Sequence, residues 1–218
     1  MMNPSEKPIE IKHALYESVA KVSKALGQQT RLEIIEILAQ APRNVEAVAR
    51  ILKLEIKSVS QHLKVLEENG LVSARREGRY RWYSVSCREV VELAVHLRRT
   101  AQKLYDIESP AQTGDRLTLR DALTLSQSGE LLLIDVRPKV EFDAGHLPNA
   151  MSLPLEELEK TIGTLPWEKP AAAYCRSNYC FLVKQAQAIF ADHGRRLLLV
   201  EDGVEDWLAD APYVLTTK

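Results

Sequence analysis

The stretch that decides the fold of the first half is Ser58-Val-Ser-Gln-His-Leu-Lys-Val-Leu-Glu-Glu-Asn-Gly-Leu-Val72, followed by Arg75-Arg-Glu-Gly-Arg-Tyr-Arg-Trp-Tyr83. Its first part has apolar residues at helical spacing and closes on Asn69-Gly70, a pair typical of a helix end. Its second part has the pattern of two strands around a Glu77-Gly78 turn. Together with a short helix over 44–52 and the turn over 53–55, this polar-faced helix predicts a helix-turn-helix, and the basic hairpin after it predicts a wing.

The predicted helix, 56–68, has one inward and one outward face. At about 100° per residue, the inward face holds Ile56, Val59, Leu63 and Leu66. The opposite side carries Lys57, Ser58, Ser60, Gln61 and Lys64. Amides and hydroxyls can read base edges, while lysines meet phosphates. His62 lies nearer the buried edge, which favours packing or a phosphate contact over base reading.

The hairpin carries four arginines around its tip and flanks: Arg75, Arg76, Arg79 and Arg81. A basic ribbon placed after such a helix is suited to following a phosphate backbone. The alternative is a solvated hairpin on an ordinary helical domain. We expect DNA binding through Lys57, Ser58, Ser60, Gln61, His62, Lys64, Arg75, Arg76, Arg79 and Tyr80.

Further helices surround this motif. The pattern predicts helices over 11–26, 30–38, 44–52 and 88–106, with Asn44 as the N-cap of the third and a turn over 53–55. The apolar stripes of the first and last helices exceed what a small core requires. Pairing with a second copy would bury them, so we expect a homodimer on a palindromic operator of double-stranded DNA.

Composition points to two units with different partners. The chain has 218 residues with a net charge of −1, yet residues 1–107 carry 18 Lys and Arg against 13 Asp and Glu, while residues 108–218 carry 11 against 17. The basic half could bind a polyanion, which the acidic half would repel. We predict a domain over 1–106, a linker over 107–116 and a domain over 117–218. Three Cys, no apolar run of membrane length and a polar N-terminus predict a cytoplasmic protein without membrane contact.

The first half resembles the ArsR family of bacterial repressors over about residues 10–105. The resemblance rests on the helix, the Gly-Leu-Val junction and the wing, and it implies a homodimeric repressor that an inducer, often a metal, releases from its operator. The first half holds one thiol, Cys87, and a His96–Glu92 pair that fits a helix surface. A thiolate or carboxylate–His site needs more ligands than these. We therefore expect no metal and no cofactor.

The second half alternates helices with short apolar strands. Strands are predicted over 131–136, 151–153, 171–174 and 197–200, and helices over 120–127, 138–144, 155–162 and 181–193. Uniformly apolar strands between helices indicate a parallel sheet covered on both faces. The predicted fold is thus an all-α winged helix-turn-helix with a β-hairpin wing, followed by an α/β domain. In parallel sheets the active site lies at the carboxyl ends of the strands.

One such end carries a cysteine loop. It comprises Cys175, Arg176, Ser177, Asn178, Tyr179 and Cys180. Loop amides and the dipole of the following helix would stabilise a thiolate or a persulfide anion on Cys175. The alternative is a buried cysteine that only packs. The position between strand, loop and helix favours the reactive thiol.

This half resembles the rhodanese family over about residues 116–212. The resemblance rests on the Leu133–Ala150 segment, the Cys175 loop and the closing Glu201-Asp-Gly-Val-Glu-Asp-Trp207. It implies that Cys175 is the nucleophile that carries a persulfide and that Asp135 and Arg137 lie near the loop. The six-residue loop resembles that of sulfurtransferases, whereas related phosphatases have a longer one.

The loop departs from the family where many members carry a basic residue, because Cys180 stands at its sixth position. One hypothesis is that Cys180 resolves the persulfide on Cys175 into a disulfide or polysulfide link; the alternative is that it packs at the helix start. Together the halves predict a repressor that senses reactive sulfur from a small donor such as thiosulfate or a persulfide. Two alternatives stay open: a working sulfurtransferase with an accessory DNA-binding half, and a regulator that binds a metal or metalloid through both cysteines.

Overall fold

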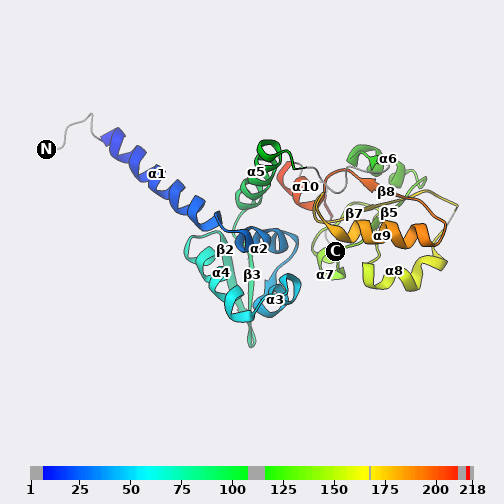
Figure 1. Cartoon of the computed structure of the whole chain (residues 1–218), viewed down its shortest axis with the longest axis horizontal. Coiled ribbons are helices and arrows are strands. Elements are labelled where there is room, and N and C mark those ends of the chain that lie inside the picture. The colour runs from blue at the N-terminus through cyan, green and yellow to red at the C-terminus, as the bar shows by residue number, and fades with distance from the viewer. Residues whose placement is uncertain (1–6, 108–115, 167, 211–214, 217–218) are drawn as a thin grey trace. The chain divides into compact units, whose positions relative to one another are not determined.

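The computed structural model describes residues 7–107, 116–166, 168–210 and 215–216. The chain divides between Val90 and Val91 into two compact units, which we describe separately (Figure 1). The division falls inside helix α5 (Arg88–Tyr105), so most of this helix belongs to the second unit. The predicted linker, 107–116, lies outside the described residues except for its two ends, and the predicted domain boundaries stay predictions.

The first unit is helical with a small antiparallel sheet. Its elements are α1 (Lys7–Leu26), α2 (Gln29–Gln40), β1 (Arg43–Asn44), α3 (Val45–Leu52), α4 (Ile56–Glu68), β2 (Val72–Glu77), β3 (Tyr80–Val85) and the start of α5. The strand order is β1-β3-β2, with Glu77 opposite Tyr80 at the tip of the predicted wing. The winged helix-turn-helix is confirmed. Strand β1 was not predicted, because its two residues become a strand only by pairing with β3.

The predicted helix caps are confirmed. The Asn44 side chain accepts a hydrogen bond of 2.9 Å from the Ala47 N–H at the start of α3. At the end of α4, Gly70 has a φ of 72°, a conformation that glycine adopts without a steric penalty. The chain then turns so that the Leu71 N–H donates to the Leu66 carbonyl at 2.9 Å.

The core of the first unit contains three of the four inward residues predicted for α4. Val59, Leu63 and Leu66 are fully buried, together with residues of α2. The prediction for Ile56 was wrong, since its side chain is 52% exposed. Ile56 opens the helix, so no preceding turn shields it, although its position on the helical wheel matches the core face.

The second unit is an α/β domain. After α5 come β4 (Arg116–Leu117), α6 (Leu119–Gln127), β5 (Leu132–Asp135), α7 (Lys139–Ala144), β6 (Met151–Ser152), α8 (Leu155–Thr161), a 3-10 turn (Ile162–Thr164), β7 (Ala171–Tyr174), α9 (Phe181–Asp192), β8 (Leu197–Val200) and α10 (Val204–Asp210). The sheet has the order β4-β8-β7-β5-β6, and its neighbouring strands pair in parallel. The predicted parallel sheet is confirmed.

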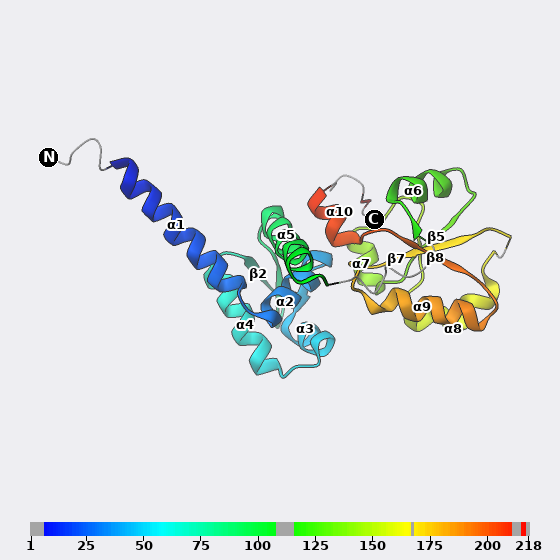
Figure 2. The ribbon, with the colours of Figure 1, turned by 45° about the horizontal axis from the view of Figure 1, so that its top comes forward.

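Helices cover both faces of this sheet. Figure 2 shows α8 and α9 on one side of β5, β7 and β8, with α6 on the other. Alternate strand residues divide accordingly: Ala171 and Ala173 pack in the cluster that includes α8 and α9, whereas Ala172 and Tyr174 pack with α6 and α10. Burial on both faces explains why the strands are apolar without alternation. Within the described residues, no helix combines the length and apolar character that crossing a bilayer requires.

Candidate nucleic-acid interface and candidate sulfur site

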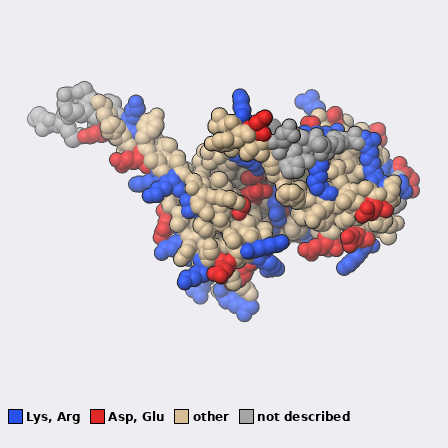
Figure 3. All heavy atoms as spheres, in the orientation of Figure 1, with Lys and Arg blue, Asp and Glu red and all other residues tan. Residues whose placement is uncertain are grey.

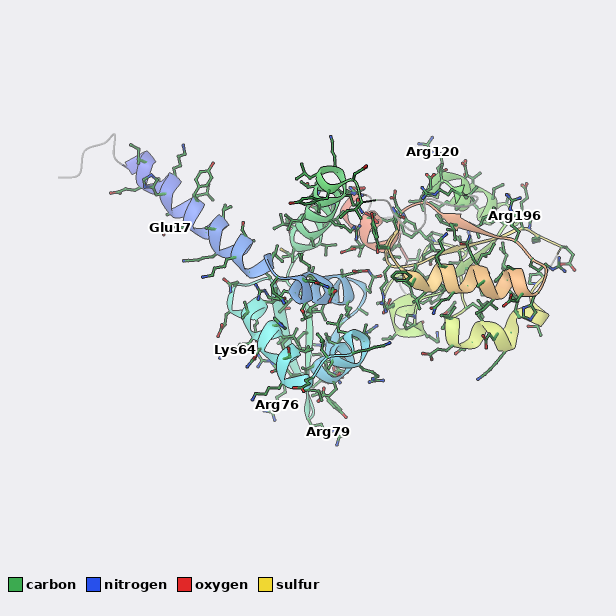
Figure 4. All side chains as sticks on the ribbon, viewed as in Figure 1. Glu17, Lys64, Arg76, Arg79, Arg120 and Arg196 are labelled. Carbon is green, nitrogen blue, oxygen red and sulfur yellow. A yellow bond between two sulfur atoms is a disulfide. The ribbon has the colours of Figure 1, made fainter. Side chains whose placement is uncertain are left out.

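The outer face of α4 presents the predicted polar residues. Lys57, Ser60, Gln61 and Lys64 are exposed, and Ser58 and His62 are half-buried. Lys64 points away from the first unit (Figure 4) and meets Glu68 at 3.7 Å in a highly exposed pair. An ion pair this exposed holds its lysine weakly, which leaves Lys64 available to a phosphate.

His62 differs electrostatically from its neighbours on α4. Burial lowers the pKa of His62 below its ordinary value, and the positive charge of Arg31 lowers it further. His62 is therefore less inclined than an ordinary histidine to carry a positive charge near pH 7. This agrees with the prediction that His62 lies at the edge of the buried face.

The wing presents an exposed basic tip. Arg75 lies 3.4 Å from Glu77, while Arg79 donates to the Tyr80 hydroxyl at 2.7 Å and lies over its ring at 4.9 Å. Arg76 Nε donates to the Gly78 carbonyl at 3.4 Å. Figure 3 shows Lys and Arg gathered at the end of the first unit that carries the wing, and Figure 4 shows Arg76 and Arg79 projecting there. The structure thus brings the predicted helix and wing residues to one region.

Arg81 has a different role from the other wing arginines. Its guanidinium pairs with Glu67 of α4 and lies 5.4 Å from the Tyr83 ring centroid. This pair links the wing to the helix that it follows in sequence. Arg81 thus has a partner on α4, a contact that the count of hairpin arginines could not reveal.

The candidate sulfur site lies where β7 ends. Cys175 follows the strand directly and is 3% exposed, and Cys180 is the N-cap residue of α9. A disulfide joins the two residues, whose Cα atoms are 6.2 Å apart. The loop therefore brings both thiols together, as the resolving-cysteine hypothesis requires. The thiolate predicted for Cys175 belongs to the reduced form of this loop.

Side chains from other elements hold the loop. Arg176 donates to both carboxylate oxygens of Glu141 in α7, at 2.9 and 2.6 Å. Glu141 is fully buried, and Arg176 compensates its carboxylate there. Asn178 donates to Asp202 at 3.1 Å, and the Tyr179 hydroxyl donates to the Ile107 carbonyl at 3.2 Å.

The start of α10 also holds the loop, through backbone contacts. The Val204 N–H donates to the Cys175 carbonyl at 3.1 Å, and the Glu205 N–H donates to the Arg176 carbonyl at 2.9 Å. Gly203 lies against the loop so closely that a Cβ atom there would be 2.4 Å from the Ser177 Cα. Only glycine fits this approach without moving the backbone.

Asp135 and Arg137 form a buried pair at the end of the neighbouring strand, β5. Both side chains are fully buried, and Arg137 Nη2 donates to Asp135 at 2.6 Å and to the Gly145 carbonyl at 2.7 Å. Burial opposes the charge on Arg137, but Asp135 together with Tyr174 and Glu141 outweighs burial and raises the Arg137 pKa. Asp135 pairs in register with Tyr174, next to Cys175. Arg137 also lies 5.7 Å from the Tyr174 ring centroid, so the pair adjoins the residue before Cys175 but has no exposed surface for a substrate.

Two family models match separate parts of the chain. A model described as bacterial regulatory protein, arsR family, matches residues 28–74, and the rhodanese-like domain matches residues 118–210. The HTH-type transcriptional regulator Rv0324 of Mycobacterium tuberculosis is 36% identical over 210 residues, which covers 92% of each chain. The chain belongs to the ArsR family of transcriptional regulators and carries a rhodanese-like domain.

Solved structures resemble each half of the regulator. The homodimeric winged helix-turn-helix DNA-binding domain Mb0332 of Mycobacterium bovis is 36% identical, covers 47% of this chain and 92% of that chain, and has a TM-score of 0.42. A rhodanese-related protein of Thermoplasma volcanium is 20% identical, covers 48% of this chain and 100% of that chain, and also has a TM-score of 0.42.

Sequence reasoning missed the residues that hold the sulfur loop. Glu141 and Gly203 lie inside the quoted rhodanese-like segments, but helix α10 itself was not predicted. Glu141 shares the short helix α7 with Asp143, and nothing in the sequence distinguishes the buried carboxylate from the exposed one. The described part of the chain contains no group of three or more His, Cys, Asp or Glu side chains placed to hold a metal ion.

Proposed function

We propose that this regulator is a homodimeric repressor of a palindromic operator and that its rhodanese-like domain senses reactive sulfur through Cys175. The observation that carries the proposal is the pairing of Cys175 with Cys180 in one loop, on the same chain as a winged helix. A dithiol that a sulfur donor can convert into a disulfide has two states, and a sensor requires two states with different affinity for the operator.

DNA contact is assigned to α4 and the wing. Exposed amide and hydroxyl groups of Gln61 and Ser60 suit base edges, while Lys57, Lys64 and the wing arginines suit phosphates. The wing arginines Arg75, Arg76 and Arg79 lie within reach of solvent, and their partners are exposed groups of the same hairpin. Such contacts exchange readily for phosphate oxygens.

The homodimer is supported by apolar side chains that α1 leaves uncovered. Ile11, Leu15 and Val19 lie on one stripe and are 66%, 59% and 48% exposed. Stripes of this kind are typical of surfaces that a second copy covers. The M. bovis relative, which is described as homodimeric, is consistent with this assignment.

The sulfur chemistry has two steps. In the first, the Cys175 thiolate attacks the outer sulfur of a persulfide donor RSSH, the donor S–S bond breaks, and RSH leaves; with thiosulfate the leaving group is sulfite. In the second, the Cys180 thiolate attacks the inner sulfur of the Cys175 persulfide and releases hydrosulfide. The two thiols lose two electrons and the transferred sulfur gains them, so no other oxidant is required.

A gel-shift titration tests the proposal. The probe is the DNA upstream of the regulator's own gene, with and without a persulfide donor, for wild type, Cys175→Ser and Cys180→Ser. We expect the donor to change wild-type affinity about tenfold, which corresponds to about 1.4 kcal/mol of coupling. Cys175→Ser should not respond, and Cys180→Ser should accumulate a Cys175 persulfide by intact mass.

Three results would contradict the proposal. The first is tight DNA binding that the donor leaves unchanged. The second is thiosulfate turnover that depends on Cys175 without any change in DNA binding, which would favour a working sulfurtransferase. The third is release of the DNA by arsenite, cadmium or zinc but not by the sulfur donor, which would favour a metal- or metalloid-responsive regulator.

A further inference from the structure

Helix α10 contacts the sulfur loop at one end and carries an acidic cluster along its length. Its first-turn N–H groups hold the Cys175 and Arg176 carbonyls. Glu205 and Asp206 of the same helix are only 2% and 3% exposed. Two carboxylates at that depth are costly unless cations compensate them. Burial accordingly raises the Asp206 pKa, although Arg98 and Arg99 oppose that shift.

The compensating cations come from α5. Arg98 pairs with Glu205 and also donates to Asp206 at 2.6 Å. Arg99 lies 3.2 Å from Asp206 and donates to both oxygens of Asp210, at 2.6 and 3.1 Å. All these residues belong to the second unit, whereas α5 itself begins at Arg88 in the first. One helix therefore belongs to both units and is ion-paired to the helix that holds the loop.

We infer that Arg98 and Arg99 are positioning residues of the sulfur loop, and that α10 transmits the thiol state of Cys175 and Cys180 to α5. The inference rests on the proposed function and specifies its route. Helix α5 follows β3, the second strand of the wing, in the sequence. A change in the pairing of α5 with α10 can therefore be passed along α5 to the first unit.

Tight packing links the chemical state of Cys175 and Cys180 to the position of α10. The cavity beside Cys175 and Cys180, lined also by Tyr174, Lys184 and Asp202, has a volume of about 10 Å³. That is no more than the roughly 10–15 Å³ that one water molecule needs. A persulfide adds a sulfur atom there, and opening the disulfide separates two sulfurs. Because Gly203 lies directly against the loop backbone, we expect either change to displace the start of α10.

The experiment measures the disulfide equilibrium of the full-length protein in dithiothreitol redox buffers, with and without the upstream DNA. Linkage requires the DNA to shift this equilibrium by the same factor by which the disulfide changes DNA affinity. For wild type we expect about tenfold, equivalent to about 30 mV for a two-electron couple. The double variant Arg98→Gln/Arg99→Gln should reduce the shift to less than about twofold, while its reduced form keeps DNA affinity within about threefold of wild type.

Two further variants separate coupling from folding. Lys103→Gln removes an exposed charge from the same helix and should retain the full wild-type shift. Arg98→Lys keeps the cation beside Glu205 and should retain a shift of more than about threefold. A variant that merely misfolds would lose DNA affinity together with the DNA-induced shift of the disulfide equilibrium. It would not lose the shift while keeping the affinity, as we expect for the double variant.

The outcomes distinguish the inference from the proposed function. If DNA does not shift the wild-type disulfide equilibrium, the proposed function itself fails. If the wild-type shift appears and the double variant retains it, the function stands and the α5–α10 route is wrong. If the double variant loses both the shift and DNA binding in the reduced state, Arg98 and Arg99 support the fold and the positioning role is overturned.

Discussion

The two candidate sites are built in opposite ways. The nucleic-acid interface comprises one helix and one hairpin that are adjacent in sequence, and most of its side chains are exposed. The sulfur site draws on α5, α7, β7 and α10, and several of its charged residues are buried. Binding at an exposed site depends on which ligand atoms its side chains can contact. The stability of a buried site depends on which groups neutralise its charges. Substitutions of the exposed interface residues should therefore act on DNA affinity, and substitutions of the buried Asp135–Arg137 pair should act on stability.

The largest effect should come from the buried pair of the second unit. Asp135→Ala leaves the Arg137 guanidinium buried without its carboxylate, and losing one partner of such a pair typically costs about 3–5 kcal/mol. Urea unfolding followed by tryptophan fluorescence measures this loss. The matched control is Asp143→Ala, whose pair with Lys139 is exposed and should contribute less than about 1 kcal/mol. Equal losses in the two variants would remove the distinction between the sites.

An intermediate effect, on binding rather than stability, should come from the wing. Arg79→Ala should weaken DNA binding across different sequences and reduce the slope of log affinity against log salt by about 0.9, the value for one lost phosphate contact. Its unfolding free energy should stay within about 0.5 kcal/mol of wild type. Arg120→Ala is the control, because Arg120 is exposed on α6 (Figure 4). An unchanged salt slope in Arg79→Ala would remove the wing tip from the interface.

The smallest effect should come from His62, at the border between the exposed and buried faces of α4. Because its folded-state pKa is lowered, the unfolded chain binds a proton first as pH falls below about 6.5. The contribution of His62 to stability is thus fully present above this pH and is lost as pH falls toward the folded-state pKa. His62→Gln should unfold with less pH dependence than wild type between pH 7 and 5. Parallel pH profiles would show that His62 has an unperturbed environment.

The same contrast explains what could be predicted from sequence. Helix α4 spans the predicted residues, 56–68, because local periodicity and the Asn69-Gly70 end determine it. The parallel sheet followed from apolar strands between helices. Strands β1 and β4 have two residues each and exist through their partners, so no local pattern marks them. Helix α10 was not predicted: its buried carboxylates, Glu205 and Asp206, pair with Arg98, which lies 107 and 108 positions earlier, so no local pattern marks their burial.

The functional predictions divide along this line as well. The loop from Cys175 to Cys180 could be recognised because its chemistry is contiguous in sequence. Ile56 was placed in the core because of its position in the helical period. The period does not show that the first residue of a helix has no preceding turn to bury it. Arg81 was counted among the four hairpin arginines without a role of its own, because its pairing with Glu67 of α4 depends on how the hairpin packs and leaves no local sequence signal.

The short spacing between the two cysteines has a consequence for chain entropy. A disulfide stabilises a fold mainly by restricting the unfolded chain, and the restriction grows with the number of residues enclosed. Cys175 and Cys180 are only five positions apart, so their bond removes about 2 kcal/mol of that freedom, the low end of the usual range. Reducing this bond should therefore cost the domain less stability than reducing a disulfide that encloses a long loop.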